Sequence, residues 1–343
     1  MTQAETDTDQ ILLLVHQLVA GQSLTADQSH QFFSAVVNGQ MDEVWLSAAV
    51  STIKMRGQTA DELAGAASAL LASATPFPSP DYPFADVVGT GGDGHNTINL
   101  STIAAITAAT CGARIVKHGN RSISSASGSF DLLEAVGVNF DIDPEAARQQ
   151  VDTRGLCFLF APRYHAGMRH AGHVRKALKM RTIFNLLGPL VNPARPPLML
   201  LGVADPGLLD QIAEVLAMLQ CQSALVVHGS GVDEVAIHGP TSVVELQDGK
   251  IDKYEVAPAD FDAPKWQLDQ LTCNDTAESH RRSIAVLEGQ GSDAENAAVA
   301  VNVAMVLRLF GHNDLKQNYA TAIESLQRSA PGELIRKLVA EQA

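Results

Sequence analysis

A short apolar run leads directly into a glycine-rich loop at residues 84–102, which read FADVVGTGGDGHNTINLST. The apolar run, Phe84–Val88, has the composition of a buried strand. A helical pattern resumes after the loop, near Ser101 and Thr102. A strand, a glycine loop and a helix in this order are typical of a βα unit in a parallel sheet. Because ligands of such sheets gather at the carboxyl ends of the strands, this loop is the first candidate binding site.

The same alternation of apolar runs and helical stretches continues along the chain. It predicts a mainly parallel central sheet with strands at Phe84–Val88, Ala113–Val116, Leu156–Phe160, Leu198–Val203 and Ala224–Val227. The stretch Ser242–Val256 contains an Asp248-Gly249 turn, which is a hairpin signal. We expect this hairpin to be an antiparallel appendage.

The residues before Thr75 have the periodicity of amphipathic helices. Four short helices are expected, the first at Ile11–Ala20 with Asp9 as its cap, the second after a Thr25/Gln28 capping box, the third at Asp42–Arg56 and the fourth after a Thr59/Glu62 capping box. The proline-rich run Thr75–Pro80 then breaks any helix, because proline lacks an amide donor. The predicted fold class is therefore α/β, with a small N-terminal helical domain and a larger α/β domain.

Composition narrows the class of protein further. Of 343 residues, 46% are hydrophobic and 18% charged, which is a globular balance. The formal charge of −14 repels polyanions, so we expect no nucleic-acid partner. No apolar run approaches the ~20 residues of a membrane span, and the acidic, polar first residues differ from an export signal, so we expect a cytoplasmic protein with no membrane partner. The four cysteines form no CxxC pair, which argues against a structural zinc site.

The glycine loop has the features of a phosphate-binding site. Glycines at positions 89, 91, 92 and 94 let backbone amides converge on an anion. Hydroxyl and amide side chains follow at the expected helix N-terminus, where a phosphate is favoured: Thr97, Asn99, Ser101 and Thr102. The loop also fits the dinucleotide pattern G-x-G-x-x-G. However, the next strand ends in Lys117-His118 rather than in the acidic residue that a nicotinamide ribose needs, and Asp93 would repel a bare pyrophosphate.

A second group of donors follows the next predicted strand. Lys117-His118-Gly119-Asn120-Arg121-Ser122-Ile123-Ser124-Ser125 combines cations with small hydrogen-bonding residues, and Gly128-Ser129 opens another helix. Lys117 would act as a point charge on phosphate, and the amides and hydroxyls that follow it would bind further oxygens. The sequence therefore predicts a second phosphate-binding segment at the same edge of the sheet.

These motifs, together with four others, make the chain resemble the anthranilate phosphoribosyltransferase family of tryptophan synthesis. The other segments are Arg175–Thr182, Asn185–Pro193, Val232–Val235 and the continuation Asn99–Thr102. The likeness spans nearly the whole chain. It implies the fold of the nucleoside phosphorylase and phosphoribosyltransferase class, with a helical domain at residues 1–76 and about 172–190. The α/β domain, which binds phosphoribosyl pyrophosphate (PRPP), would comprise residues 77–171 and 191–343.

The resemblance also implies roles for individual residues. PRPP would be bound by Gly89, Gly92, Asp93, Thr97, Asn99, Leu100, Ser101, Thr102, Lys117, His118, Gly119, Asn120, Arg121, Ser122, Ile123, Ser124, Ser125 and Ser129. Anthranilate would contact Gly89, Asn120 and Arg175, and two Mg²⁺ ions would have ligands at Ser101, Asp233 and Glu234. A homodimer is also implied. Ala126 stands where many relatives have a lysine, so one phosphate contact is absent.

The chemistry of three residue types agrees with these roles. Asp233 and Glu234 follow a predicted strand and a Gly-Ser-Gly turn, so two carboxylates meet at a sheet edge where Mg²⁺ could bridge to phosphate. Arg175 has a planar guanidinium that can form two parallel hydrogen bonds with a carboxylate such as that of anthranilate. The alternative is that Arg175 forms an ion pair with an acidic neighbour on the surface. The four histidines His118, His165, His170 and His173 lack metal-ligand spacing, and we expect them to pack or form hydrogen bonds.

The expected reaction is displacement of pyrophosphate from PRPP by the amino group of anthranilate. Lys117, Asp233 and Glu234 would act electrostatically, the two carboxylates through Mg²⁺, and no general base is assigned because an aromatic amine is neutral at pH 7. Three alternatives stay open from the sequence: a pyrimidine nucleoside phosphorylase of similar fold, a nicotinamide oxidoreductase, and a non-catalytic protein that binds a phosphoribosyl ligand.

Overall fold

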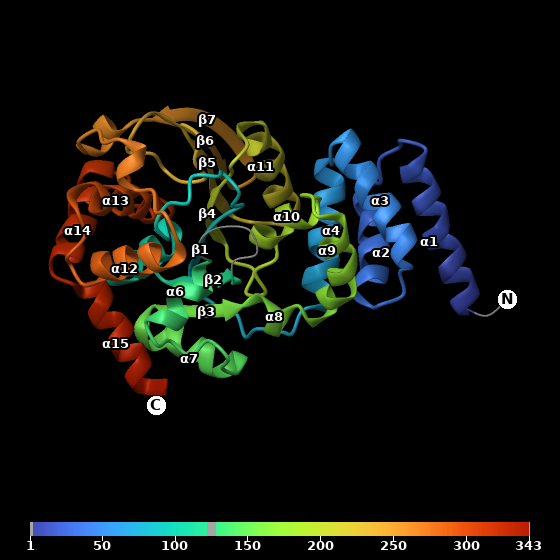
Figure 1. Ribbon diagram of the computed structural model, residues 1–343, viewed down its shortest axis with the longest axis horizontal. Coiled ribbons are helices and arrows are strands. Elements are labelled where there is room, and N and C mark those ends of the chain that lie inside the picture. The colour runs from blue at the N-terminus through green and yellow to red at the C-terminus, as the bar shows by residue number, and fades with distance from the viewer. Residues whose placement is uncertain (1–2, 122–127, 343) are drawn as a thin grey trace.

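The chain begins as a bundle of helices and continues as a helix-flanked sheet, as the computed structural model of residues 3–121 and 128–342 shows (Figure 1). The bundle consists of α1 (Gln3–Val19), α2 (Ala26–Val37), α3 (Glu43–Arg56) and α4 (Ala60–Ser73). Both predicted capping boxes are confirmed, because Thr25 and Thr59 accept from the amides of Gln28 and Glu62, respectively.

The predicted start of the first helix is wrong. Helix α1 begins at Gln3 and passes through Asp9 instead of being capped by it. Residues 3–5 are good helix formers, but residues 3–10 have no apolar periodicity, so a prediction based on apolar spacing starts too late. The other three starts agree with the sequence, including Asp42, which accepts from the amides of Val44 and Trp45.

Seven strands form one sheet with the order β3-β2-β1-β4-β5-β6-β7. The strands are β1 (Ala85–Gly89), β2 (Ile115–Gly119), β3 (Leu156–Phe160), β4 (Leu198–Gly202), β5 (Ser223–Gly229), β6 (Thr241–Gln247) and β7 (Lys250–Val256). The first five are parallel, as predicted, and β6 and β7 are antiparallel. The predicted hairpin is confirmed, but it is not an appendage: β6 pairs with β5 over the whole strand and extends the central sheet.

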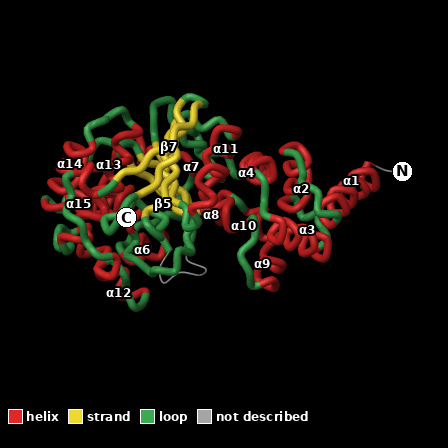
Figure 2. Tube along the Cα trace, turned by 90° about the horizontal axis from the view of Figure 1, so that it is seen from above, coloured by secondary structure: helices red, strands yellow, loops and turns green. Residues whose placement is uncertain are grey.

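The two faces of the sheet pack against different helices. In β4, Leu198 and Leu200 belong to the core with α5 (Leu100–Thr110) and α13 (Asp293–Leu309), because alternate residues of a strand point to opposite faces. Met199 and Leu201 belong to a second core with α11 (Leu209–Met218) and the N-terminal bundle. The remaining helices of this part are α6 (Ser129–Ala135), α7 (Pro144–Arg154), α12 (Thr276–Leu287), α14 (Leu315–Gln327) and α15 (Ala330–Gln342). Figure 2 shows the strands between these helices.

A segment after β3 returns to the bundle. It contains α8 (Ala161–Tyr164), a 3₁₀ helix at Ala166–Ala171, α9 (Gly172–Leu178) and α10 (Phe184–Leu187). The backbone of this segment lies close against the bundle at Gly167, where a side chain would collide with Val37 of α2. Val174 and Phe184 share the core of α2 and α4. Figures 1 and 2 show this segment against the bundle, where α10 contacts α4 and α9 contacts α3. None of the helices in the described ranges is long and apolar enough to cross a membrane.

Candidate active site

Two adjoining cavities lie at the carboxyl ends of β1, β2 and β5, facing the segment that carries α9 and α10. Their volumes are about 980 Å³ and about 600 Å³. Residues shared by both linings join them into one cleft: Gly91, Asn99, Ser101, Arg175, Asn185, Asp233 and Glu234. The cleft therefore lies where the parallel sheet predicted a ligand site.

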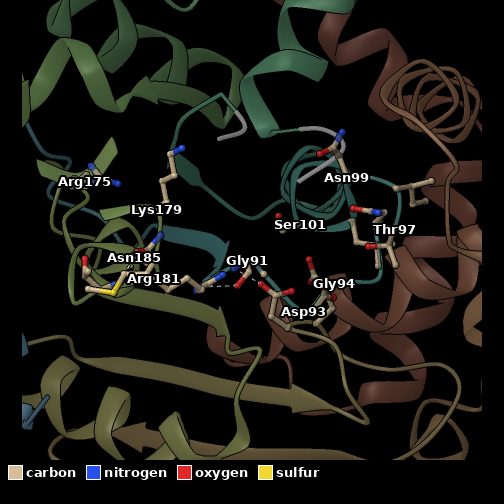
Figure 3. A pocket seen from close by; sticks show the side chains of 18 of the residues that line it. Gly91, Asp93, Gly94, Thr97, Asn99, Ser101, Arg175, Lys179, Arg181 and Asn185 are labelled. Carbon is tan, nitrogen blue, oxygen red and sulfur yellow. Dashed lines mark hydrogen bonds between the residues drawn. The ribbon is translucent and has the colours of Figure 1, made fainter. Parts of the chain in front are cut away.

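The structure brings together every predicted site residue that it describes. The larger cavity is lined by Gly92, Asp93, Thr97, Asn99, Leu100 and Ser101. The smaller one is lined by Gly89, Thr102, Lys117, His118, Gly119, Asn120, Arg121 and Ser129. Arg175, Asp233 and Glu234 line both, and Figure 3 shows Arg175 across the cavity from Ser101 and Asp93. Ser122, Ile123, Ser124, Ser125 and Ala126 lie outside the described residues.

The glycine loop is held against the acidic pair. The N–H of Gly91 donates to Asp233 Oδ2 at 2.6 Å. Gly89 has no room for a side chain, because a Cβ there would collide with the Asp233 carboxylate. Gly91 and Gly92 both have positive φ, at 64° and 84°, a conformation that favours glycine. The loop between β1 and α5 thus needs its glycines for close approach as well as for conformation.

Three carboxylates concentrate negative charge at the end of β5. Burial, together with the charge of Asp93, raises the pKa of Asp233 to about 6. Burial and the charge of Asp233 also hold the pKa of Glu234 well above its usual range. Such crowding of carboxylates in a buried place destabilises their ionised forms unless a cation joins them.

The acidic pair fits a divalent cation shared with a substrate. Among the described residues, no group of three or more His, Cys, Asp and Glu side chains is arranged to hold a metal ion by itself. Mg²⁺ in phosphate sites is usually held by one or two carboxylates plus phosphate oxygens, rather than by a complete protein cage. Two adjacent carboxylates with raised pKa values and a hydroxyl at Ser101 on the same cleft match that requirement.

Asn302 of α13 holds the segment that carries the acidic pair. Its Oδ1 accepts from the Val235 N–H at 3.0 Å, and its Nδ2 donates to the Val235 carbonyl at 3.2 Å.

We expect Asn302→Ala to leave both buried backbone groups of Val235 unpaired and to lower the free energy of unfolding by about 2 kcal/mol. Urea denaturation measures this loss. Asn302→Asp should be as damaging, because it removes the donor, so an unfolding curve unchanged in both variants would contradict the assigned contacts.

Lys117 is buried in the floor of the cleft and is flanked by acidic groups. Its ammonium donates to the Val87 carbonyl of β1. Burial lowers its pKa, and the charges of Asp86 and Glu234 oppose that change. Asp86 is itself buried and accepts from Asn192 Nδ2 at 2.8 Å, while burial raises the pKa of Asp86 to about 6. The cation is therefore built into the sheet rather than mobile in solvent.

Arg175 presents its guanidinium from the opposite wall. It lies over the Phe184 ring, with 5.5 Å between the guanidinium carbon and the ring centroid. Burial lowers its pKa, and no carboxylate in the described ranges opposes this change. The surface ion pair that the sequence left open for Arg175 is therefore not seen among the described residues. Arg175 instead stacks on Phe184 and faces the cleft, where it can bind an anionic ligand.

Two histidines, His118 and His165, lie next to each other in the lining of the smaller cavity. The rings of His118 and His165 are 5.3 Å apart in an edge-to-face arrangement. Burial lowers the pKa of His118 to about 3 and also lowers the pKa of His165, so both rings are neutral near pH 7. His165 Nε2 lies 2.8 Å from the Val191 carbonyl. This agrees with the expectation for two of the four histidines, because both rings pack and His165 also forms a hydrogen bond.

Sequence reasoning missed several residues of the cleft. Arg181 and Asn185 line it from the segment after α9. Behind its lining, the charge of Asp86 acts on Lys117, and Asn192 donates a hydrogen bond to Asp86. Arg181 belongs to a cation-rich stretch, Arg175–Arg181, that lines the larger cavity in an acidic protein. This concentration of cations was the feature of the sequence that could have indicated Arg181 as a residue of the cleft. No comparable signal in the sequence pairs Asp86 with Asn192, which are 106 positions apart.

The two parts of the chain correspond to two family models. Residues 13–74 match the helical bundle domain of a glycosyl transferase family, and residues 81–330 match the α/β domain of such a family. The fold and the cleft therefore define a glycosyltransferase class in which a helical bundle precedes an α/β domain.

Relatives within this class are more specific. The chain is 52% identical over 330 residues to the anthranilate phosphoribosyltransferase of Photobacterium profundum, covering 96% of this chain and 97% of that protein. The structure of the Thermus thermophilus anthranilate phosphoribosyltransferase is similar with a TM-score of 0.89 and 36% identity, over 95% of this chain and 98% of that one. The chain belongs to the anthranilate phosphoribosyltransferase family.

A more distant relative has been solved with ligands. The Saccharomyces cerevisiae anthranilate phosphoribosyltransferase in complex with PRPP and Mg has a TM-score of 0.87 and 26% identity, over 99% of both chains. The same yeast protein in complex with 4-fluoroanthranilate has a TM-score of 0.86 and 25% identity, over 97% of both chains.

Proposed function

We propose that this enzyme transfers the phosphoribosyl group of PRPP to the amino group of anthranilate, in tryptophan biosynthesis. One observation carries the proposal: a buried lysine, a glycine loop and an acidic pair converge on one cleft, with a stacked arginine on its other wall. The lysine, the glycine loop and the acidic pair can bind a diphosphate with its metal, and the arginine can bind a carboxylate. The relatives named above act on or bind these two kinds of molecule.

The donor is proposed to bind along the ends of β1 and β2. Gly92, Asp93, Asn99–Thr102 and the Lys117–Ser125 segment with Ser129 would surround its phosphates and ribose. Ser101, Asp233 and Glu234 would hold two Mg²⁺ ions, which when bound neutralise charge that develops on the leaving diphosphate. Lys117 adds a fixed cation on the same side, aimed by its bond to the Val87 carbonyl.

The acceptor is proposed to lie between Arg175, Asn120 and Gly89. The guanidinium of Arg175 is stacked on Phe184 and pairs with no carboxylate among the residues that the structure describes, so it can bind the anthranilate carboxylate through two parallel hydrogen bonds. The amine nitrogen then attacks the anomeric carbon as the bond to pyrophosphate breaks, pyrophosphate leaves with the electron pair of that bond, and the nitrogen loses one proton to water. Since the attacking amine is already neutral, positioning and charge neutralisation supply the catalysis, and no residue is assigned as a general base.

Further features are part of the same proposal. The helical domain would comprise residues 1–76 and about 172–190, and the α/β domain residues 77–171 and 191–343, because Val174 and Phe184 share a core with α2 and α4.

We also propose a homodimer, since the large apolar side chains of Leu13, Val19 and Val44 are exposed on α1 and α3 and a second copy would cover them. A cytoplasmic location is part of the same proposal.

The proposed function is tested by following the loss of anthranilate fluorescence on addition of PRPP, with and without Mg²⁺. The expected result is turnover that requires PRPP and is largely abolished by EDTA. Phosphate-dependent cleavage of thymidine, assayed in parallel, is expected to be absent. Thymidine cleavage without consumption of anthranilate would overturn the proposal in favour of a pyrimidine phosphorylase.

Arg175→Lys tests the acceptor site. A lysine keeps the positive charge, but it cannot form two parallel hydrogen bonds with a carboxylate and does not stack on Phe184 as the guanidinium does. We expect the KM for anthranilate to rise by about 10-fold or more, which corresponds to one lost charge-assisted hydrogen bond, and the KM for PRPP to change little. Steady-state kinetics with each substrate varied in turn measures both values. An equal rise in both KM values would contradict a specific role at the acceptor.

A further inference from the structure

The middle of the glycine loop depends on a contact from the opposite side of the cleft. Its two ends are anchored within the α/β part: the Thr90 N–H donates to the Gly202 carbonyl at 2.9 Å, and the Cys273 N–H donates to the Asn96 carbonyl at 2.9 Å. Between them, Arg181 Nη2 donates to the carbonyl of Gly91 at 3.0 Å and lies 3.4 Å from that of Thr90. Figure 3 shows Arg181 reaching toward Gly91 from the wall that carries Arg175 and Asn185.

These bonds fix the direction of two successive peptide groups. A trans peptide is planar, so its C=O and N–H point in opposite directions. The carbonyl of Thr90 faces Arg181, and the N–H of the same peptide, that of Gly91, donates to Asp233 on the other side. The carbonyl of Gly91 also faces Arg181, so the N–H of Gly92 points away from it. Among the described residues, none accepts a hydrogen bond from this N–H.

The fit between Arg181 and the loop is also steric. A side chain at Gly92 would collide with the Arg181 guanidinium, and Gly92 has a φ of 84°. The guanidinium therefore lies against the loop where only a glycine leaves room. Arg181 belongs to the segment between α9 and α10, which packs with the helical bundle, so this contact joins the two walls of the cleft.

We propose that Arg181 is a positioning residue that orients the glycine loop as an anion receptor. By holding the carbonyls of Thr90 and Gly91, it keeps the Gly92 N–H turned toward the donor side of the cleft. This inference rests on the proposed function, because it assumes that the anion at the loop belongs to PRPP. Arg181 acts through the loop, and the chemistry of the transfer does not involve it.

The test compares Arg181→Ala with Arg181→Lys and with the control Arg328→Ala, which removes an exposed guanidinium next to α14 that pairs with Glu324. Amide hydrogen exchange of the peptide that contains residues 89–94 is measured in the absence of substrates. The affinity for PRPP is measured by calorimetry in the presence of Mg²⁺ and the absence of anthranilate. Because Arg181 is exposed, the melting temperature of each variant should stay close to that of the wild type.

Arg181→Ala is expected to accelerate exchange in this peptide and to weaken PRPP binding by about 5- to 10-fold, since it removes a charge-assisted contact with two carbonyls. Arg181→Lys should restore part of both, because an ammonium can reach one carbonyl but not both. Arg328→Ala should change neither. Weaker PRPP binding with unchanged exchange would overturn positioning in favour of a direct phosphate contact. The exchange measurement does not depend on catalysis, so a failed anthranilate assay in the wild type would overturn the proposed function separately.

Discussion

Lys117→Met is expected to lower kcat/KM for PRPP by about 10²- to 10³-fold, the range found when one preorganised donor to a developing anion is removed. Lys117 is 2% exposed, and its ammonium is fixed by the Val87 carbonyl. Methionine fills a similar volume without the charge, so the loss would be electrostatic. Initial rates at varied PRPP concentrations, with saturating Mg²⁺ and anthranilate, give kcat and KM separately. A loss of less than about threefold would contradict a catalytic charge at this position.

A double variant separates this effect from misfolding. In Lys117→Met alone, the buried carboxyl of Asp86 loses its cation, which we expect to cost about 3 kcal/mol of the free energy of unfolding. Lys117→Met combined with Asp86→Asn removes both charges and keeps the hydrogen bond that Asn192 can make. The double variant should therefore recover much of the stability while activity stays low. Recovery of activity along with stability would show that Lys117 has a structural role.

Glu234→Gln is expected to lower kcat by about 100-fold or more and to raise the Mg²⁺ concentration needed for half-maximal activity. Glutamine preserves the shape of the side chain but offers the cation no negative charge. Titrating MgCl₂ at saturating PRPP and anthranilate measures both effects, and Glu333→Gln, an exposed change on α15, is the matched control. Near-normal turnover at saturating Mg²⁺ would contradict the assignment of Glu234 as a metal ligand.

The same variant should not be less stable without metal. Burial and the charge of Asp233 hold the pKa of Glu234 well above its usual range, so folding without a bound cation disfavours the ionised form of this side chain. Removing that charge relieves repulsion within the acidic group. We expect the melting temperature of Glu234→Gln in EDTA to equal or exceed that of the wild type. A clear decrease would mean that Glu234 mainly stabilises the fold, as the counterion of Lys117.

The sequence predicts those parts of the molecule that depend on local pattern. Apolar β-branched runs located β1 to β5 to within two residues at most ends, and the Asp248-Gly249 turn located the β6–β7 hairpin. Because parallel strands end at one edge of a sheet, the residues that follow β1, β2 and β5 could be expected to meet. They do meet, since Asp93 and Asp233 line one cavity of the cleft and Lys117 and Asp233 line the other.

Other features depend on contacts between distant segments, which leave no local pattern. The sequence does not indicate that Asn192 bridges Asp86 and the Val116 carbonyl, or that Asn302 holds Val235. The return of the segment around α9 and α10 to the bundle was inferred from chain order and the family resemblance, and periodicity alone would not give it. The extension of the sheet by β6 was missed because an Asp-Gly turn predicts a hairpin but not the strand that pairs with it.

We propose that three strand ends form one receptor for a diphosphate and its metal. A crystal structure of the protein with PRPP and Mn²⁺ in place of Mg²⁺ tests this proposal, because anomalous scattering locates the metal independently of the ligand. We expect Mn²⁺ peaks at Asp233 and Glu234, with the diphosphate within hydrogen-bond distance of the Gly92 amide and the Lys117 ammonium. A diphosphate bound away from these groups, or metal peaks elsewhere on the chain, would contradict it.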